Sequence, residues 1–326
     1  MYNYTHNQHF KFGYDGEWFN SRRDQDSQWQ VEYGQCERVA GSFRDEVLHV
    51  ARLVEDQSKS LGLPIDIMYS GGTESEMMLR SFTEQGINVR VNILRFKDKR
   101  NYHDIKSAEK FCSNHGITPC YHDLDILKFW EGLAYEYAER TRCTSPQLLS
   151  TMWLMDQLDG LPCLGSGECY ISYGDMEKYQ YLDKKALAIL ENPITDYPKR
   201  PWYMHERERI AAWYRHAMIQ DRPAVPGYFQ YTPEVMLSFL LDSTTRELAN
   251  CEHWGKLSNV STKKTVYEKY FPNLIQRTKT TGFEQVMGHD HVIRKELDRL
   301  WGNYNAEVVN EYNQLVEHLK GYKYEQ

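Results

Sequence analysis

The sequence predicts an α/β protein with a doubly wound parallel sheet and a helical C-terminal part. Between residues 63 and 164, short apolar runs alternate with longer segments that have helical periodicity. Gly62, Gly86 and Gly116 follow three of the helical segments, at the position where a left-handed residue commonly ends a helix. This alternation is typical of parallel strands joined by helical crossovers, with ligands at the carboxyl ends of the strands.

The individual elements follow from caps and periodicity. The first helix is expected to begin after Ser42, a favourable N-cap residue, and to end at Ser60 before Gly62. Four strands are expected at residues 65–69, 89–96, 120–124 and 161–164. Helices are expected at residues 74–85, 102–114, 126–140 and 146–158. A further amphipathic helix is expected at residues 204–219, with a stripe formed by Ile210, Trp213, Tyr214 and Ala217.

The chain divides into three parts without a low-complexity linker. Residues 1–40 are rich in aromatic and amide side chains and in turn dipeptides, so they are predicted to form short strands or an extended cover. Residues 41–175 contain the alternating pattern and form the predicted α/β domain. Residues 176–326 are predicted to be a helical region on the substrate side, interrupted by Pro193, Pro198, Pro201, Pro223 and Pro226.

Composition limits the classes of protein to which the chain can belong. Its 326 residues carry a net charge of -7, and a pI near 6.0 argues against a protein that coats nucleic acid. The polar, aromatic N-terminus does not resemble a signal peptide, and no apolar run reaches the length of a membrane span. Seven cysteines form no Cys-x-x-Cys pair, which favours reduced thiols in a cytoplasmic protein over disulfides or a zinc site.

Residues 65–76, Ile-Asp-Ile-Met-Tyr-Ser-Gly-Gly-Thr-Glu-Ser-Glu, are the most informative part of the chain for function. An apolar strand leads into a turn at residues 70–73, and an apolar helix follows. Two glycines let the backbone approach a ligand closely, and the N-terminus of the helix favours an anion. Neither Gly-x4-Gly-Lys-Ser/Thr nor Gly-x-Gly-x-x-Gly occurs in the chain. The turn is therefore predicted to bind a phosphate; the alternative is that Ser and Gly only cap the helix.

This turn resembles the pyrophosphate loop of the N-type ATP pyrophosphatases, the PP-loop superfamily, whose usual form is Ser-Gly-Gly-x-Asp-Ser. The resemblance implies an adenine nucleotide alpha hydrolase-like, Rossmann-like fold in which the loop holds the phosphates of ATP that leave as pyrophosphate. Glu74 stands where the family has Asp, which implies that its carboxylate is a ligand of Mg2+ with one extra methylene. The ATP-binding residues implied by the resemblance are Ser70, Gly71, Gly72, Thr73, Glu74 and Ser75.

Within this superfamily the chain most resembles the synthetase domain of asparagine synthetase. Leu-Gly-Ser-Gly-Glu at residues 164–168 is similar to a Thr-Gly-Glu turn of that domain, which implies that Glu168 is a catalytic carboxylate that helps an amine attack. The family continues with Ser-Asp-Glu, whereas this chain has Tyr-Ile-Ser at residues 170–172. Asp175 is the nearest later carboxylate and the candidate for a second metal ligand. An ordinary turn carboxylate is the alternative for Glu168.

Residues 263–283 resemble the closing segment of the same domain, in which a helix with a basic start leads to Phe-Pro and then Arg-x-Lys-x-Gly-Phe. Arg277, Lys279 and Phe283 match that pattern with one inserted residue before Gly282. The resemblance implies that Lys279 is catalytic and stabilises charge on the departing pyrophosphate, and that Arg277 binds the nucleotide. The alternative for Lys279 is a solvated surface lysine.

The resemblance covers about residues 63–285 and implies an ATP-dependent ligase that forms AMP and pyrophosphate. A substrate carboxylate would be adenylated, and ammonia or an amine would then form the amide. The glutaminase domain with an N-terminal cysteine is not expected, so the implied partners are a small carboxylate, an amine and a possible ammonia-supplying protein. Two alternatives stay open: a PP-loop enzyme that modifies a nucleobase or nucleotide, such as 7-cyano-7-deazaguanine synthase or a tRNA-modifying relative, and a catalytically silent nucleotide-binding protein.

Overall fold

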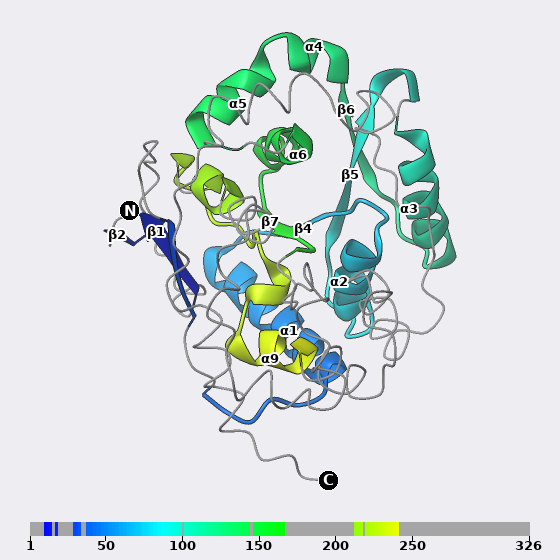
Figure 1. Ribbon diagram of the computed structural model, residues 1–326. Helices are drawn as coiled ribbons and strands as arrows, with labels where there is room; N and C mark the ends of the chain where they lie inside the picture. The colour runs from blue at the N-terminus through cyan, green and yellow to red at the C-terminus, as the bar shows by residue number, and fades with distance from the viewer. Residues whose placement is uncertain are drawn as a thin grey trace, which may run out of the picture.

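A parallel sheet with the strand order β6-β5-β4-β7 forms the centre of the computed structural model (Figure 1). Its strands are β4 (Ile65–Met68), β5 (Arg90–Phe96), β6 (Cys120–Leu124) and β7 (Leu161–Leu164). All three strand pairings are parallel, which confirms the α/β class predicted from the alternating pattern. The structure describes residues 10–14, 17–18, 29–33, 37–99, 101–141, 143, 146–166, 212–217 and 219–240.

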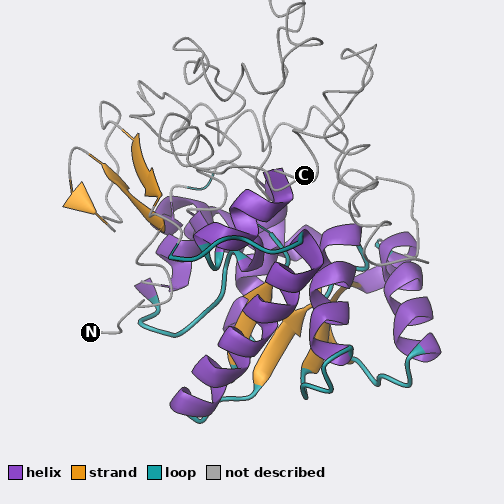
Figure 2. Ribbon diagram, turned by 90° about the horizontal axis from the view of Figure 1, so that it is seen from below, coloured by secondary structure: helices purple, strands orange, loops and turns teal. Residues whose placement is uncertain are grey.

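Helices cover both faces of this sheet, so the doubly wound arrangement is confirmed (Figures 1 and 2). The helices that join or precede its strands are α1 (Phe43–Leu61), α2 (Thr73–Thr83), α3 (Tyr102–Asn114), α4 (Ile126–Glu131), α5 (Leu133–Thr141) and α6 (Pro146–Asp156). The first three share one apolar core with Ile67 and Val91 of the strands. The last three share a second core with Met68 and Leu164. Side chains of β4 thus alternate between the two cores, as the pleat requires.

Most helices and strands begin and end near the residues predicted from the sequence, but one predicted helix is interrupted. Ser42 Oγ accepts a hydrogen bond from Asp45 N at 3.2 Å, and Gly62 ends α1 with a φ of 65°. The single helix expected at residues 126–140 is wrong, because Gly132 separates α4 from α5 with φ -160° and ψ -69°. Glycine is a poor helix former, which favours a break in the helix at this position.

Described residues of the segments 212–217 and 219–240 belong to the same two cores as the sheet. Val225 forms a parallel bridge with Cys163, so this segment extends the sheet beside β7. The segment continues through the 3-10 helix η6 (Tyr228–Gln230) into α9 (Pro233–Leu240), which packs on α1. Tyr228 is fully buried, and its hydroxyl donates a hydrogen bond to Val47 O at 2.9 Å. Of the stripe expected at residues 204–219, Trp213, Tyr214 and Ala217 are buried as predicted, and Ile210 lies outside the described residues.

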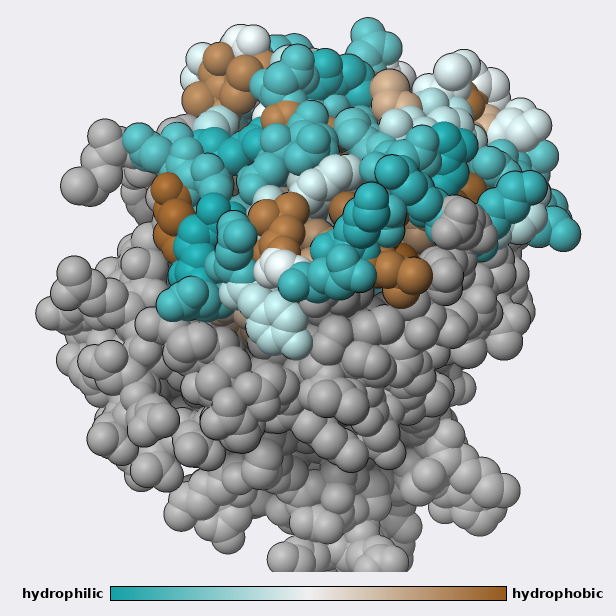
Figure 3. Space-filling view, turned by 90° about the horizontal axis from the view of Figure 1, so that it is seen from above, coloured by the Kyte–Doolittle hydropathy of each residue, from teal (hydrophilic) through white to brown (hydrophobic). Residues whose placement is uncertain are grey.

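The N-terminal part forms a separate antiparallel sheet with the order β2-β1-β3. Its strands are β1 (Phe10–Tyr14), β2 (Glu17–Trp18) and β3 (Trp29–Tyr33). The division of the chain at residues 40 and 175 stays a prediction. Within the described part of the chain, no helix is long and apolar enough to cross a membrane. The described residues on the face shown in Figure 3 are mostly hydrophilic, with apolar residues in separate small groups.

Candidate functional site

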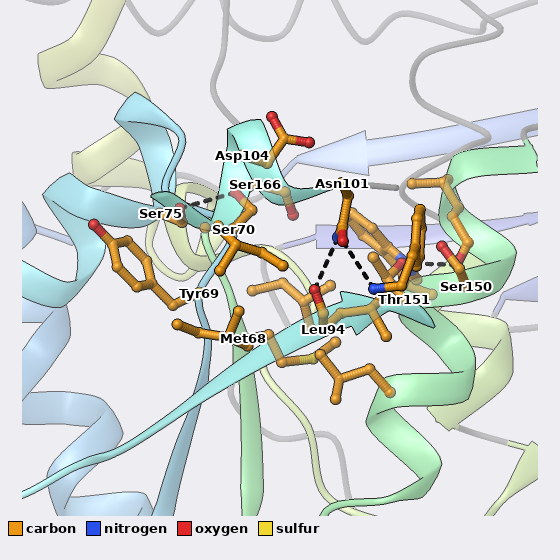
Figure 4. Close-up of a pocket in the computed structure, with 18 residues that line it drawn as sticks. Met68, Tyr69, Ser70, Ser75, Leu94, Asn101, Asp104, Ser150, Thr151 and Ser166 are labelled. Atoms are coloured by element: carbon orange, nitrogen blue, oxygen red, sulfur yellow. Dashed lines mark hydrogen bonds between the residues drawn. The ribbon is translucent and has the colours of Figure 1, made fainter. Parts of the chain in front are cut away.

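A cavity of about 280 Å³ lies at the carboxyl ends of β4, β5 and β7 (Figure 4). Met68, Leu94 and Leu164 bring the ends of these strands to its wall. The chain leaves β4 toward β5 through α2, whereas β7 lies on the other side of β4, so the strand order reverses here. Ligands of open α/β sheets bind outside the carboxyl ends of the strands at such a reversal. The cavity is therefore where the topology predicts a ligand.

The turn predicted to bind phosphate forms one end of this cavity. Ser70 and Ser75 both line it, and their hydroxyl oxygens are 3.0 Å apart. Ser75 Oγ also donates a hydrogen bond to Gly72 O at 3.1 Å, which closes the turn at the start of α2. No side chain caps α2. The turn therefore presents two hydroxyls and the N-terminus of a helix, a combination that suits an anion.

Gly71 is the position in this turn that requires glycine. Its φ is +72°, and an added Cβ would lie 2.8 Å from Ala108 N and 3.0 Å from Asp104 O in α3. A side chain there would be strained and would also push the turn away from α3. Gly72 has φ -78° and ψ 161°, an extended conformation that any residue adopts. Of the two glycines, only Gly71 thus needs the left-handed conformation.

Gly165 brings the end of β7 against the same turn. An added Cβ at Gly165 would lie 2.8 Å from Ser75 Cα and 3.0 Å from Glu74 O. The next residue, Ser166, is held from the other side: its carbonyl accepts from Phe229 N at 3.0 Å, and its hydroxyl donates to Pro226 O at 2.5 Å. The two residues that follow β7 therefore lie between the first turn of α2 and residues 226–229.

The opposite end of the cavity is apolar and neutral. Trp213 Nε1 donates a hydrogen bond to Thr151 Oγ1 at 2.9 Å, and that hydroxyl donates to Leu148 O at 2.7 Å. Ser150 and Leu154 of α6 also line the cavity, and Figure 4 shows Ser150 and Thr151 away from Ser70 and Ser75. Among the described residues that line the cavity, Asp104 is the one charged side chain, and none is cationic. The arrangement offers hydroxyl groups and a helix N-terminus at one end and an uncharged wall at the other.

The structure places some predicted site residues at the cavity and leaves others untested. Thr73 and Glu74 are half-buried in the first turn of α2, and neither lines the cavity. Glu168, Asp175, Arg277 and Lys279 lie outside the described residues, so their roles stay predictions. Within the described ranges, no group of three or more His, Cys, Asp or Glu side chains could hold a metal ion. Glu74 as a ligand of Mg2+ therefore also stays a prediction.

Cys163 precedes the lining residue Leu164 and is fully buried in β7. Burial raises the pKa of its thiol well above the ordinary value, so a reactive thiolate is not expected there. Sequence reasoning did not identify most of the lining residues as site residues, among them the polar residues Asn101, Asp104, Ser150 and Thr151. Asn101 and Asp104 could have been found, because they begin the helix that follows a predicted strand. The two hydroxyl residues of α6 gave no such signal.

Comparisons with known proteins add little to this site. No protein-family model matches the chain, and no curated protein matches its sequence. Thirteen chains of solved structures match, among them the U34-tRNA thiolase NcsA from Methanococcus maripaludis with its 4Fe-4S cluster. That alignment covers 82% of each chain at 15% identity with a TM-score of 0.27. Similarity of this extent identifies neither a substrate nor a reaction, so the α/β assignment rests on the parallel sheet and its helices.

Proposed function

We propose that the protein binds ATP in this cavity and transfers AMP to a substrate with release of pyrophosphate, as PP-loop enzymes do. One observation carries the proposal: the Ser70–Ser75 turn lies at the N-terminus of α2, where the strand order reverses, on the wall of a cavity. The phosphates would lie at the two hydroxyls and the helix N-terminus. The nucleoside would extend along the apolar ends of β4 and β5 toward α6.

In the proposed reaction, an acceptor oxygen attacks the α-phosphorus of ATP and the bond to pyrophosphate breaks. Lys279 would stabilise the charge that develops on the departing pyrophosphate. Bound Mg2+ would supply further charge neutralisation, with Glu74 and Asp175 as its proposed ligands. Glu168 would accept a proton from an amine that attacks the adenylated acceptor and displaces AMP. The chain would thus contribute positioning and charge stabilisation more than covalent chemistry.

Two classes of acceptor fit this reaction. A carboxylate is favoured by the resemblance of residues 263–283 to asparagine synthetase, with ammonia or an amine as the second substrate. A nucleobase carbonyl is the second candidate, because none of the described lining residues carries a positive charge that would hold a carboxylate. In either case the adenylation step and the release of pyrophosphate are the same.

Pyrophosphate release tests the proposal and separates the candidates. The purified protein would be incubated with Mg-ATP and ammonia in the presence of a panel of carboxylates or of nucleosides and tRNA. The adenylated product would be identified by mass spectrometry. Release that requires a carboxylate supports the ligase, and release that requires a nucleobase supports the second candidate. ATP binding without release in any mixture would instead indicate a silent nucleotide-binding protein, and no ATP binding would refute the proposal.

Lys279→Met tests the assignment of the adenylation step. If Lys279 stabilises charge only as pyrophosphate departs, ATP affinity should stay within a few-fold while pyrophosphate release falls roughly 10²–10³-fold, the usual effect of removing one preorganised charge stabiliser. Arg277→Met is the matched variant, and it should weaken ATP binding more than it slows release. Wild-type release rates in Lys279→Met would contradict the resemblance of the C-terminal part to asparagine synthetase.

A further inference from the structure

Four exposed lysines near the cavity carry charges that no described carboxylate neutralises. Lys97 and Lys99 belong to the 3-10 helix η2 (Lys97–Lys99), which follows β5, and Lys106 and Lys110 belong to α3. Within the described ranges, no ion pair joins any of the four to an Asp or Glu side chain. These charges are therefore available to an anionic ligand.

The acidic side chains described in the same region are already engaged. Asp123 forms an ion pair with Arg95, whose Nε lies 2.5 Å from Asp123 Oδ1. Glu109 accepts a hydrogen bond from Tyr121 OH at 3.0 Å, and Asp104 lines the cavity. The unpaired charge of this surface is therefore positive, although the whole chain has a net charge of -7.

Two of these lysines continue along the exposed face of α3. Tyr102, Lys106 and Lys110 are exposed and follow one another at intervals of four residues, so they lie on the same face of the helix. Each interval advances about 6 Å along the helix axis. The opposite face is buried and consists of Ile105, Ala108, Phe111 and Cys112. Figure 1 shows α3 on the outer side of β5 and β6, so the exposed face is turned away from the sheet.

The lysines meet the cavity at the N-terminal end of α3. Tyr102 is 46% exposed, and Lys99 Nζ lies 5.9 Å from the centroid of its ring. The neighbouring residues Asn101 and Asp104 line the cavity. We call Lys97, Lys99, Tyr102, Lys106 and Lys110 the lysine stripe. The lysine stripe therefore runs from the wall of the cavity along the surface of α3.

A row of cations beside an exposed aromatic ring suits one strand of nucleic acid. Proteins bind single strands through positively charged surfaces that follow the backbone and through aromatic side chains on which bases stack. The uncharged end of the cavity would accept a base more readily than a phosphate or a carboxylate. An acidic peptide would pair with the lysines but would leave the ring of Tyr102 without a partner. The net charge of -7 would repel a strand elsewhere on the protein, which confines it to the lysine stripe.

We propose that the lysine stripe binds a single-stranded segment of RNA and delivers one of its bases to the cavity. Proteins that read RNA target loops and ends whose bases are already unstacked, whereas a base in duplex DNA must first be flipped out. The strand lies along α3 with its phosphates on the lysines and a base on Tyr102. In making this strand the acceptor, the inference rests on the proposed function and selects the nucleobase over the carboxylate.

The salt dependence of RNA binding tests the lysine stripe without any nucleotide present. The probe is a labelled oligouridine of about 12 nucleotides, a length within the site sizes of single-strand grooves. The logarithm of the binding constant falls with the logarithm of salt concentration, by about 0.7 for each phosphate that the protein neutralises. Four lysines therefore predict that raising salt from about 50 to about 200 mM weakens binding roughly 50-fold. Fluorescence anisotropy measures the affinity.

Lys106→Gln combined with Lys110→Gln removes half of these charges. With two phosphates still neutralised, the same rise in salt should weaken binding only roughly sevenfold. The matched control is Lys59→Gln combined with Lys128→Gln, which removes the same net charge from exposed lysines of α1 and α4. Lys59 Nζ is paired with Glu55 Oε1 at 2.8 Å, and neither lysine belongs to the lysine stripe. The control should therefore keep the salt dependence of the wild type.

Tyr102→Ala tests whether a base stacks on the ring. Loss of one stacking side chain should weaken oligouridine binding at least about fivefold. Tyr102→Phe keeps the ring and should bind like the wild type, which separates stacking from the loss of the hydroxyl. Because the substituted positions are exposed, the melting temperatures of all these variants should stay close to that of the wild type. Equal affinities of Tyr102→Ala and wild type would contradict the stacking role.

The outcomes separate this inference from the proposed function. No RNA binding at low salt, or an equal loss of salt dependence in the control variant, refutes the lysine stripe even if the protein binds ATP. Tighter binding of an oligoglutamate of equal length would assign the stripe to an acidic protein, and tighter binding of single-stranded DNA would assign it to DNA, so either result overturns the inference. If RNA binds as expected but ATP does not bind, the proposed function is wrong and the RNA-binding surface remains. If both bind and pyrophosphate release does not depend on RNA, delivery of the base is refuted.

Discussion

The two edges of the central sheet both contain polar side chains, but they arrange them differently. At the amino edge, Asp66 accepts hydrogen bonds from Arg90 Nε at 2.8 Å, Asn92 Nδ2 at 2.9 Å and Gly160 N at 2.9 Å, and Arg90 also contacts Asp159. At the carboxyl edge, polar side chains line a cavity instead: Ser70, Ser75, Asn101, Asp104 and Ser166. One edge is a closed network, and the other surrounds a space.

The amino edge of the sheet mainly stabilises the fold, whereas the carboxyl edge forms the cavity in which a ligand can bind. The Asp66 network joins the first residues of β4 and β5 and the residue before β7, so it fixes three strands in register. The carboxyl edge is shaped by close backbone contacts at Gly71 and Gly165, which leave room for a ligand. Changes at the amino edge should therefore lower stability without altering ligand affinity. Changes at the carboxyl edge should mainly alter binding.

Asp66→Ala should produce the largest loss of stability. Asp66 is fully buried, and its removal leaves Arg90 without the partner in its bidentate ion pair. Arg90 is 40% exposed and keeps Asp159, so the main loss comes from Asn92 Nδ2 and Gly160 N, two buried donors left without their acceptor at about 1–3 kcal/mol of the free energy of unfolding each. The exposed partner of Arg90 is the control, because Asp159→Ala should cost less than about 1 kcal/mol. Urea unfolding measures both variants, and equal losses would mean that Asp66 has no special role.

Gly71→Ala should produce the largest loss of ATP binding. The strained φ and the contact with α3 would move the turn, so affinity should fall roughly 100-fold, while the left-handed conformation costs about 1–2 kcal/mol of stability. Gly116→Ala is the matched control, because Gly116 has a φ of +66° but no atom within 4 Å of an added Cβ. It should lose similar stability and keep wild-type ATP affinity. Parallel calorimetry and melting curves would show whether the two effects separate.

Glu74→Gln tests whether the carboxyl edge also binds metal. If the Glu74 carboxylate is a ligand of Mg2+, the variant should weaken Mg-ATP roughly tenfold and leave metal-free ATP nearly unchanged, because a hard cation prefers an anionic oxygen. Glu74→Asp keeps that oxygen and should bind Mg-ATP like wild type. ATP affinity with Mg2+ and with a chelator measures the difference. An equal loss in both conditions would assign Glu74 to the electrostatics of the α2 N-terminus instead.

Sequence reasoning predicted the strands and the position of the turn at residues 70–73, because both depend on neighbouring residues. The apolar run of β4, the glycine at position 71 and the helix after it are local signals. The rest of the site depends on contacts between distant residues, such as Trp213 with Thr151, which are 62 positions apart, and Val225 with Cys163. Periodicity predicts that Trp213 is buried, but it does not indicate which side chain will meet its indole N–H.

The smallest effect is expected from the titration of Asp156. Lowering the pH should reduce the stability of the fold through this carboxyl group and leave ATP affinity unchanged. Asp156 ends α6, close in sequence to the amino edge of β7, and accepts hydrogen bonds from His216 Nε2 at 2.7 Å and Tyr137 OH at 2.5 Å. Burial alone raises the pKa of this carboxyl, but the hydrogen bonds from His216 and Tyr137 outweigh burial and hold its pKa below the ordinary value of 3.8. The stabilisation is therefore complete above that value and is lost as pH falls through the lower pKa of the folded state.

Asp156→Asn removes this titration and is the variant that measures it. The wild-type melting temperature should fall more steeply than that of Asp156→Asn once the pH drops below about 4, where first the unfolded chain and then the folded protein take up a proton at this carboxyl. Above about pH 5 the two curves should run parallel, with the variant lower. ATP affinity should be the same for both proteins at neutral pH, because Asp156 does not line the cavity. A difference in ATP affinity would show that the two edges of the sheet are coupled, and the separation of stability from binding would then be incomplete.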